Sequence, residues 1–176
     1  NAKGGYGEGV VEIGGENTGI NLEGTARNTD VVLQVEGEMN LISAKGTYAL
    51  KSFSMKNCKV LYGNRSSIKL GTDLNLKNVE FNKLPWASFA SSNAIEVLNV
   101  GKTEILNCVF TDFDFGLKCL GSENVSNEVK IENCSFNHCD IGFYSSESKV
   151  QVSHSHFFNC IENGLYVHNP ETDLHI

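Results

Sequence analysis

One short segment recurs along the chain, and its recurrence limits the folds that the chain can adopt. In each copy an alternating run leads to Asn, or to His in the last copy, and three residues later to an apolar or aromatic side chain. The copies span residues 53–60, 74–81, 103–110, 129–136 and 150–157. Their Asn or His positions are 21, 29, 26 and 21 residues apart. A fixed unit with variable insertions is the sequence signature of a solenoid.

Most units carry a second alternating run, and the period of both runs indicates strands. Apolar residues recur at every second position, which is the period of a β-strand rather than of a helix. The second runs lie at Ile20/Leu22, Tyr48/Leu50, Ile68/Leu70, Ile95/Val97, Leu117/Cys119, Phe143/Ser145 and Leu165/Val167. Strands that repeat once per turn of chain give a parallel β-helix. We therefore predict an all-β, single-stranded parallel β-helix of about seven rungs, a rung being one turn of the chain.

The chain divides into a short lead-in and one long domain. Residues 1–9 are Gly-rich and irregular, and residues 10–176 are predicted to form the β-helix domain. Residues 173–176 repeat the start of a rung, with Ile176 lying 24 residues after Val152. An uncapped C-terminal end would expose unpaired backbone groups and apolar surface. We expect further β-helix beyond residue 176 in a larger parent chain, or other copies of the subunit that cover this end; a short frayed terminus is the alternative.

Charge and hydropathy exclude two classes of partner. The formal net charge is −7 and the basic residues are scattered, so the chain has no cluster of positive charge that would bind a nucleic-acid backbone. No apolar run approaches the roughly 20 residues that a membrane-spanning helix needs. We expect no nucleic-acid partner and no membrane span.

Stacking the units in register places like residues in columns that run along the helix axis. Equivalent residues of neighbouring rungs lie about 4.8 Å apart. One column is predicted to be an interior aromatic stack: Val60, Phe81, Phe110, Phe136 and Phe157. A second is predicted to be a buried ladder of Asn side chains at a sharp corner: Asn57, Asn78, Asn107 and Asn133. His154 ends this ladder and is interpreted as a structural substitute for Asn.

These motifs resemble a known family. The Asn-Cys-x-Phe corner, followed by Gly, an apolar residue, any residue and a second apolar residue, is similar to right-handed parallel β-helix proteins of the pectin-lyase-like superfamily. The resemblance covers about residues 10–176. It is specific for the fold and poor for function, because members include pectate and alginate lyases, polygalacturonases, phage tailspikes and autotransported adhesins. It implies an extracellular, cell-surface or virion-surface location.

The six cysteines follow the columns. Cys58, Cys108 and Cys134 share the position after the Asn, Cys139 and Cys160 share the third position after the Phe, and Cys119 lies alone in a strand. Stacked cysteines are close enough for a disulfide, so Cys108–Cys134 and Cys139–Cys160 bridges are one interpretation. The same columns also hold Val79, Ser155 and Phe113, so we favour buried free thiols that fill the core. Stacked cysteines do not form a zinc tetrahedron.

An acidic column is the first candidate site. Asp114, Asp140 and Glu162 each lie two residues before a repeated Gly, with Asp112 nearby. Stacked carboxylates raise one another's pKa or bind a cation, and carboxylate pairs also hydrolyse glycosides. We therefore assign Asp114, Asp140 and Glu162 as catalytic candidates. Asp114 and Asp140 are also possible ligands of a calcium ion, and we expect no other cofactor. The alternative is an ordinary turn, since Asp is common before Gly.

The insertion at residues 82–93 is the second candidate site. It explains the longest unit and carries Trp86, the only Trp in the chain. Long loops on a solenoid often bind a partner. We assign Trp86 and Phe89, with Asp112, to substrate binding, because the aromatic rings could stack on a sugar. Alternatively both aromatics fold back over apolar rung surface.

The catalytic motifs of the resembled families are largely missing. Asn28-Thr29-Asp30 matches the first polygalacturonase motif by letters, but the later motifs do not follow. Arg27 and Arg65 lie far in sequence from the acidic column that pectate-lyase chemistry would need beside an Arg base. The favoured function is therefore the rigid body of a surface or virion protein that contacts a polysaccharide or glycan. The alternative is a fragment of a polysaccharide lyase or glycoside hydrolase, and fold alone cannot decide between them.

Overall fold

The computed structural model describes most of the chain between residues 9 and 174. The described ranges are 9–13, 18–23, 26–27, 31–45, 47–49, 52–62, 68–71, 73–83, 93–98, 101–122, 127–168 and 171–174. Side chains are described from residue 54 onward within these ranges, apart from those of Cys58, Lys69 and residues 171–174.

Every described element of secondary structure is a strand. The strands are β1 (Gly9–Ile13), β2 (Thr18–Glu23), β3 (Ala26–Arg27), β4 (Val31–Lys45), β5 (Thr47–Ala49), β6 (Ser52–Tyr62), β7 (Ile68–Leu70), β8 (Asp73–Lys83), β9 (Asn93–Leu98), β10 (Lys102–Leu106), β11 (Val109–Thr111), β12 (Phe115–Leu120), β13 (Asn127–Glu132), β14 (Ser135–Asn137), β15 (Ile141–Ser146), β16 (Ser148–Ser153), β17 (His156–Phe158), β18 (Asn163–His168) and β19 (Glu171–Leu174).

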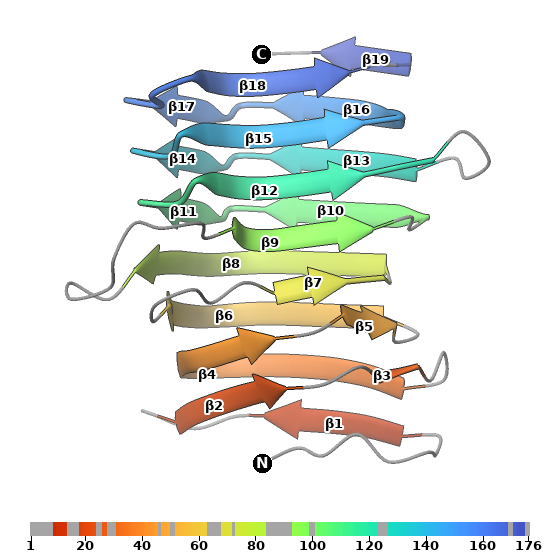
Figure 1. The fold of residues 1–176 in the computed structure, drawn as a ribbon, viewed down its shortest axis with the longest axis vertical. Helices are drawn as coiled ribbons and strands as arrows, with labels where there is room; N and C mark the ends of the chain where they lie inside the picture. Colours follow the sequence, from red (N-terminus) through yellow and green to blue (C-terminus); the bar gives the residue numbers. More distant parts are fainter. Residues whose placement is uncertain are drawn as a thin grey trace.

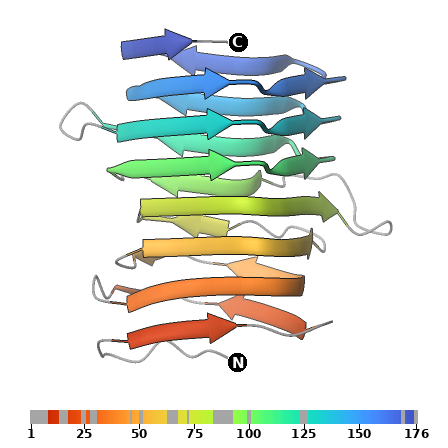
Figure 2. The ribbon, with the colours of Figure 1, turned by 180° about the vertical axis from the view of Figure 1, so that it is seen from behind.

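The strands stack as a parallel β-helix, with β1 at one end of the stack and β19 at the other (Figures 1 and 2). One sheet has 12 strands and runs β1-β4-β6-β8-β10-β13-β16-β19, with β2, β11, β14 and β17 beside this path. The other sheet has seven strands in the order β3-β5-β7-β9-β12-β15-β18, which agrees with the predicted number of rungs. A regular rung has three faces, such as β10, β11 and β12, and the long strands β6 and β8 each cover the first two without a break. The predicted fold class is confirmed.

The interior aromatic column forms as predicted. Val60 pairs with Phe81, and Phe81, Phe110, Phe136 and Phe157 pair in turn across successive rungs. Their ring centroids are 4.9, 4.8 and 5.0 Å apart, with interplanar angles of 10°, 2° and 7°. The ring separation equals the strand spacing because parallel strands in register place each ring directly over the next. The rings therefore form one continuous offset stack in the core.

The second predicted column is correct in the regular rungs and wrong in the first two. The pairings of Ile68, Ile95, Leu117, Phe143 and Leu165 agree with the predicted alignment. Ile20 instead lies in β2 and pairs with Leu41 in the 12-stranded sheet, while β3 begins the seven-stranded sheet. Tyr48 pairs with Leu70 and not with Ile68. Alternation alone does not show on which face a run lies, and the early rungs lack the Asn that marks the corner.

The register at the other end of the stack differs slightly from the prediction. Leu174 pairs with Val152, two residues earlier than the expected partner Ile176. Ile176 and residues 1–8 lie outside the described residues.

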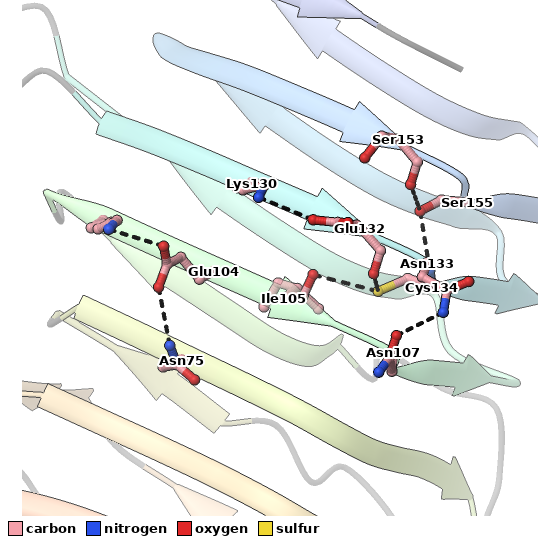
Figure 3. Close-up of polar contacts among 11 residues, drawn as sticks. Asn75, Glu104, Ile105, Asn107, Lys130, Glu132, Asn133, Cys134, Ser153 and Ser155 are labelled. Atoms are coloured by element: carbon pink, nitrogen blue, oxygen red, sulfur yellow. Dashed lines mark hydrogen bonds and ion pairs between the residues drawn. The ribbon is translucent and has the colours of Figure 1, made fainter.

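The Asn ladder is present but lies at the surface. The Asn78, Asn107 and Asn133 side-chain amides donate to the Asn side-chain oxygen of the preceding rung at 2.8, 3.0 and 2.7 Å (Asn133 to Asn107 in Figure 3). All four ladder residues have φ between 51° and 55°. The prediction of a buried ladder was wrong, because these side chains are exposed. Asn suits the site because it tolerates the left-handed backbone of the corner. His154 adopts the same conformation, with φ 49°.

The repeated Gly has a packing role. A Cβ on Gly142 would lie 2.6 Å from the carbonyl oxygen of Gly164 and 2.8 Å from a ring carbon of Phe157. Gly116 meets the equivalent atoms of Gly142 and Phe136 at the same distances. The chain passes very close to the next rung at this point in the later units, which explains their repeated Gly at 116, 142 and 164; the rung before them has the small residue Ala94 at this position.

Opposite charges alternate at two outward positions of the 12-stranded sheet, although Lys56 and Lys77 stack as like charges at a third. Asp73, Lys102, Glu128 and Lys149 occupy successive rungs at one position. Lys130 Nζ lies 3.0 Å from Glu132, and Asn75 donates to Glu104 at 3.1 Å (Figure 3). Like charges directly opposite each other destabilise a sheet. In-register strands place equivalent residues of successive rungs directly over one another. Alternating signs at these positions therefore replace repulsion with attraction.

The aromatic stack predicts a large cost for truncating one of its rings. Phe136→Ala should lower the free energy of unfolding by about 3–5 kcal/mol, because it leaves a cavity between two rings. Phe158→Ala is the matched control: Phe158 is 59% exposed, and its loss should cost less than about 0.5 kcal/mol. Urea unfolding followed by circular dichroism measures both. Equal costs for the two variants would contradict the interior stack.

The close approach at Gly142 predicts that one added methyl group destabilises the fold. Gly142→Ala should cost about 1–3 kcal/mol, because the methyl group meets a backbone oxygen that cannot move aside freely. Gly101→Ala is the control, since its added Cβ would meet only the Asp73 carboxylate oxygen at 3.4 Å. Thermal unfolding of both variants gives the comparison. A stable Gly142→Ala protein would show that the rungs can separate at this point.

Candidate functional site

The corner between the second and third faces brings two of the predicted acidic residues into one column. The Ile141 N–H donates to the Asp114 carbonyl at 2.8 Å, and the Asp140 N–H donates to the Phe113 carbonyl at 2.9 Å. Asp114 and Asp140 therefore occupy equivalent positions in neighbouring rungs, directly before β12 and β15. Both are partly exposed. Their catalytic and metal-binding roles stay predictions.

Glu162 lies at the corner of the next rung but is offset by one residue. The Ile161 N–H donates to the Cys139 carbonyl at 2.9 Å, so Ile161 occupies the position equivalent to Asp140. The Glu162 N–H then donates to the Asp140 carbonyl at 2.9 Å. This corner contains one extra residue before Gly164, and counting back from the Gly hid the offset. Ile161, which is 77% exposed, thus follows the two aspartates in the column, with Glu162 beside it.

Asp112 belongs to a second left-handed column that the sequence analysis missed. Asp112, His138 and Asn159 have φ of 67°, 52° and 52° and directly follow β11, β14 and β17. The Asp112 N–H donates to the Asn137 carbonyl at 3.1 Å, and the His138 ring nitrogen Nε2 lies 3.3 Å from Asn159 Nδ2. The signal was available: Asp, His or Asn stands two residues after each of the last three Phe of the stack, and these types are enriched in left-handed backbone.

Lys83 is the other residue of this corner that the sequence did not indicate. It is the last residue of β8, and its Nζ lies 5.8 Å from the centroid of the Phe113 ring. Burial lowers the pKa of Lys83, while the charges of Asp114, Asp112 and Asp140 act to raise it. The ammonium group therefore lies within the electrostatic field of the corner carboxylates and offsets part of their mutual repulsion.

The other candidate positions from the sequence lie in parts of the chain that the structure does not describe. Trp86, Phe89 and Arg65, and the segment Asn28-Thr29-Asp30, lie outside the described residues. Among the side chains that are described, no group of three or more His, Cys, Asp or Glu residues is arranged to hold a metal ion.

The outer face of β12, β15 and β18 carries an aromatic column next to the acidic corner. Lys118, Tyr144 and Tyr166 pair in successive rungs. The Tyr144 and Tyr166 rings are stacked at 5.4 Å and 7°, and Phe115 meets Tyr144 edge-on at 5.9 Å and 89°. Each residue of the Lys118 column is the outward member of the repeated Gly motif. That position varies between units, so a search for recurring residues did not detect it.

A buried carboxylate holds the lysine of this face in place. Lys118 Nζ lies 3.5 Å from Glu96 of the preceding rung, and the two side chains are 24% and 9% exposed. The same Nζ lies 5.1 Å from the centroid of the Phe115 ring, within the range of a cation–π interaction. Phe115, Lys118, Tyr144 and Tyr166, which we call the tyrosine face, therefore form a chain of contacts anchored by Glu96. The tyrosine face lies beside Asp114 and Asp140, since Phe115 and Ile141 directly follow them.

The described cysteines are free. Cys108, Cys119, Cys134 and Cys139 are buried, and Cys160 is partly exposed. The free-thiol interpretation is confirmed for these five, and the Cys58 side chain lies outside the described residues. Burial raises the pKa of the Cys139 thiol to about 12, and it also raises the pKa of the Cys119 thiol. Protonated, buried thiols fill space in the core and are poor nucleophiles.

Comparison with known proteins places the chain in a family. The right-handed β-helix region family matches residues 40–176, which is most of the chain. The protein therefore belongs to the right-handed β-helix family. No curated protein and no solved structure shows a significant match. The part of the chain that the structure describes contains no helix long and apolar enough to cross a membrane.

The position of Lys83 predicts how the corner responds to calcium. Lys83→Met removes the ammonium group and leaves the carboxylates of Asp112, Asp114 and Asp140 without its charge. Calcium should then stabilise the variant, by about 2.7 kcal/mol at 100 times the dissociation constant, and should change the wild-type protein much less. Thermal unfolding with calcium or with chelator measures the difference. Lys77→Met, on an exposed outer position, is the control. Equal calcium stabilisation of the wild type would mean that Asp114 and Asp140 bind the ion despite Lys83.

The buried thiols predict a loss of stability at alkaline pH. Above the ordinary thiol pKa of 9.0, the unfolded chain releases protons that Cys139 retains in the folded state until about pH 12. The unfolded state then binds fewer protons, so stability falls as pH rises, by up to about 1.4 kcal/mol per pH unit for each such thiol. Lys83 opposes this trend up to its ordinary pKa of 10.5, since its pKa is lowered in the folded protein.

Substitution separates the two contributions. Cys139→Ala should reduce the decline in stability between pH 9.0 and about 12, and Lys83→Met should steepen it. Urea unfolding on either side of pH 9.0 provides the measurement. An unchanged slope in Cys139→Ala would show that this thiol ionises normally in the folded protein.

Proposed function

We propose that the protein is the rigid β-helix body of a surface protein that contacts a glycan through its tyrosine face. The observation that carries this proposal is the line of Phe115, Lys118, Tyr144 and Tyr166 on an outer sheet surface. Aromatic rings with polar tips suit a partner that is partly apolar and partly hydroxylated. The tyrosine rings supply apolar surface and hydroxyl groups, and Lys118 adds a donor.

The β-helix supports this function by holding the contact residues fixed. Each residue of the tyrosine face lies on a strand that is hydrogen-bonded to both neighbouring rungs or, for β18, to β15. Sites built on regular strands are more precise than sites built on loops. A ligand therefore meets a surface that needs little reorganisation, which lowers the entropic cost of binding.

The proposal also covers the superfamily of the protein, its location and its partners. The chain is of the pectin-lyase-like type, similar to tailspikes and adhesins, and acts at the cell exterior or on a virion surface. Its partners are a polysaccharide or glycan, together with the rest of a parent chain or other copies of the subunit. The support is the family membership and the repeated Asn-Cys-x-Phe corner.

The acidic corner favours an enzyme as the second candidate. Asp114 and Asp140 lie in adjacent rungs, about 4.8 Å apart along the axis, and Lys83 lies within their electrostatic field. Retaining glycosidases need two carboxyl groups about 5–5.5 Å apart. In this candidate Asp114, Asp140 and Glu162 are the catalytic residues of a polysaccharide lyase or glycoside hydrolase, with Asp112, Trp86 and Phe89 in substrate binding.

A binding experiment tests the proposed function. The protein is screened against immobilised glycans, and positive sugars are titrated in solution by calorimetry against wild type, Tyr166→Ala and Lys130→Ala. Tyr166 is 43% exposed, so its loss should weaken binding with little effect on stability. Lys130→Ala, on the outer face of the other sheet, should bind as the wild type does. Release of reducing ends or of unsaturated sugar products, lost in Asp140→Asn, would support the enzyme instead. Binding that Tyr166→Ala leaves unchanged would refute the role of the tyrosine face.

A further inference from the structure

The tyrosine face is linear, and its line follows the helix axis. Phe115 and Lys118 lie in one rung, Tyr144 in the next and Tyr166 in the third, on the strands β12, β15 and β18 shown in front in Figure 1. Parallel strands in register set the step between rungs at about 4.8 Å. The Tyr144 and Tyr166 rings cover each other's faces, with centroids 5.4 Å apart. A ligand on this surface therefore meets the edges and hydroxyl groups of a regular row, one step per rung.

The charges around this row do not suit an acidic ligand. Lys118 is the only cation of the tyrosine face, and Glu96 lies 3.5 Å from its Nζ, so its charge is already compensated. Asp114 and Asp140 directly precede β12 and β15, the strands that carry Phe115, Lys118 and Tyr144. Lys83 offsets part of the charge of these carboxylates. A polyanion would meet repulsion from the remainder, with no uncompensated cation in the row to counter it. A neutral glycan meets donors, acceptors and apolar ring edges without that repulsion.

We infer that the glycan is neutral and extended, and that it lies along the helix axis with one sugar residue on each of at least three rungs. This inference rests on the proposed function and names the class of ligand and its direction. The chain length follows from the three rungs that carry the row, and the neutrality follows from the compensated Lys118 and the bordering aspartates. Neutral pyranose chains match the row because one sugar unit is about as long as the step between rungs, about 4.8 Å.

A series of oligosaccharides of increasing length tests both parts. Neutral gluco-, manno-, xylo- and galacto-oligosaccharides of one to six units, and oligogalacturonides of the same lengths, are titrated by calorimetry. For the neutral series, affinity should rise up to about three units and then level off, and it should be insensitive to salt. Tyr144→Ala should weaken the trisaccharide about tenfold, and Lys130→Ala should leave it unchanged. Tyr144→Phe, which keeps the ring, controls for loss of folding and isolates the hydroxyl group.

The outcomes separate this inference from the function on which it rests. An oligogalacturonide that binds more tightly than every neutral sugar, with affinity lost in Tyr144→Ala, overturns the inference and leaves the proposed function standing. Equal affinity for one unit and for three overturns the axial arrangement. Asp140→Asn should improve oligogalacturonide binding relative to that of the neutral sugars; an unchanged ratio of the two affinities would refute the electrostatic argument. If no sugar of either series binds, both the inference and the proposed function fail.

Discussion

The parallel, in-register hydrogen bonding between rungs is the constraint on which the rest of the structure depends. It places each residue directly over its counterpart, so every position must tolerate contact with its own kind. Aromatic rings satisfy this by stacking at 4.8–5.0 Å, and Asn satisfies it by donating to the Asn below. Gly satisfies it by leaving space where two rungs approach most closely. Like charges repel when stacked, and at the outward position of Lys102, Glu128 and Lys149 the signs alternate, whereas Lys56 and Lys77 are stacked like charges.

The corners show how two demands meet in one residue. A sharp turn requires a left-handed backbone, and the exposed turn residue must also fit the stack. At the first corner Asn meets both demands, with φ near 50–55° and a hydrogen bond to the next rung. At the second corner Asp112, His138 and Asn159 share the backbone conformation but not one side chain, so no uniform ladder forms there. The second corner is consequently more variable, and it is also where the carboxylates and Lys83 gather.

The sequence predicted what repeats and missed what does not. The aromatic column, the Asn ladder and the pairing of the later rungs were predictable, because each follows from stacking like residues at a fixed step. Burial of the ladder was not, because Asn at a corner bonds equally well whether the corner faces solvent or the core. The offset of Glu162 was hidden by a single extra residue that only the hydrogen bonds reveal. Lys83 ends a strand of an earlier rung, and its approach to Asp114 depends on the path of the chain around the corner.

The same logic explains where a function can arise on such a fold. Inward positions are fixed by packing, and a change there costs several kcal/mol. Outward positions of the strands, by contrast, can change with little effect on the core, so they are free to acquire a ligand. Lys118, Tyr144 and Tyr166 occupy one such position in three rungs, and the stack aligns them without any further design. A binding surface on a β-helix therefore needs only compatible residues at one outward position of consecutive rungs, and the fold supplies their spacing, direction and rigidity.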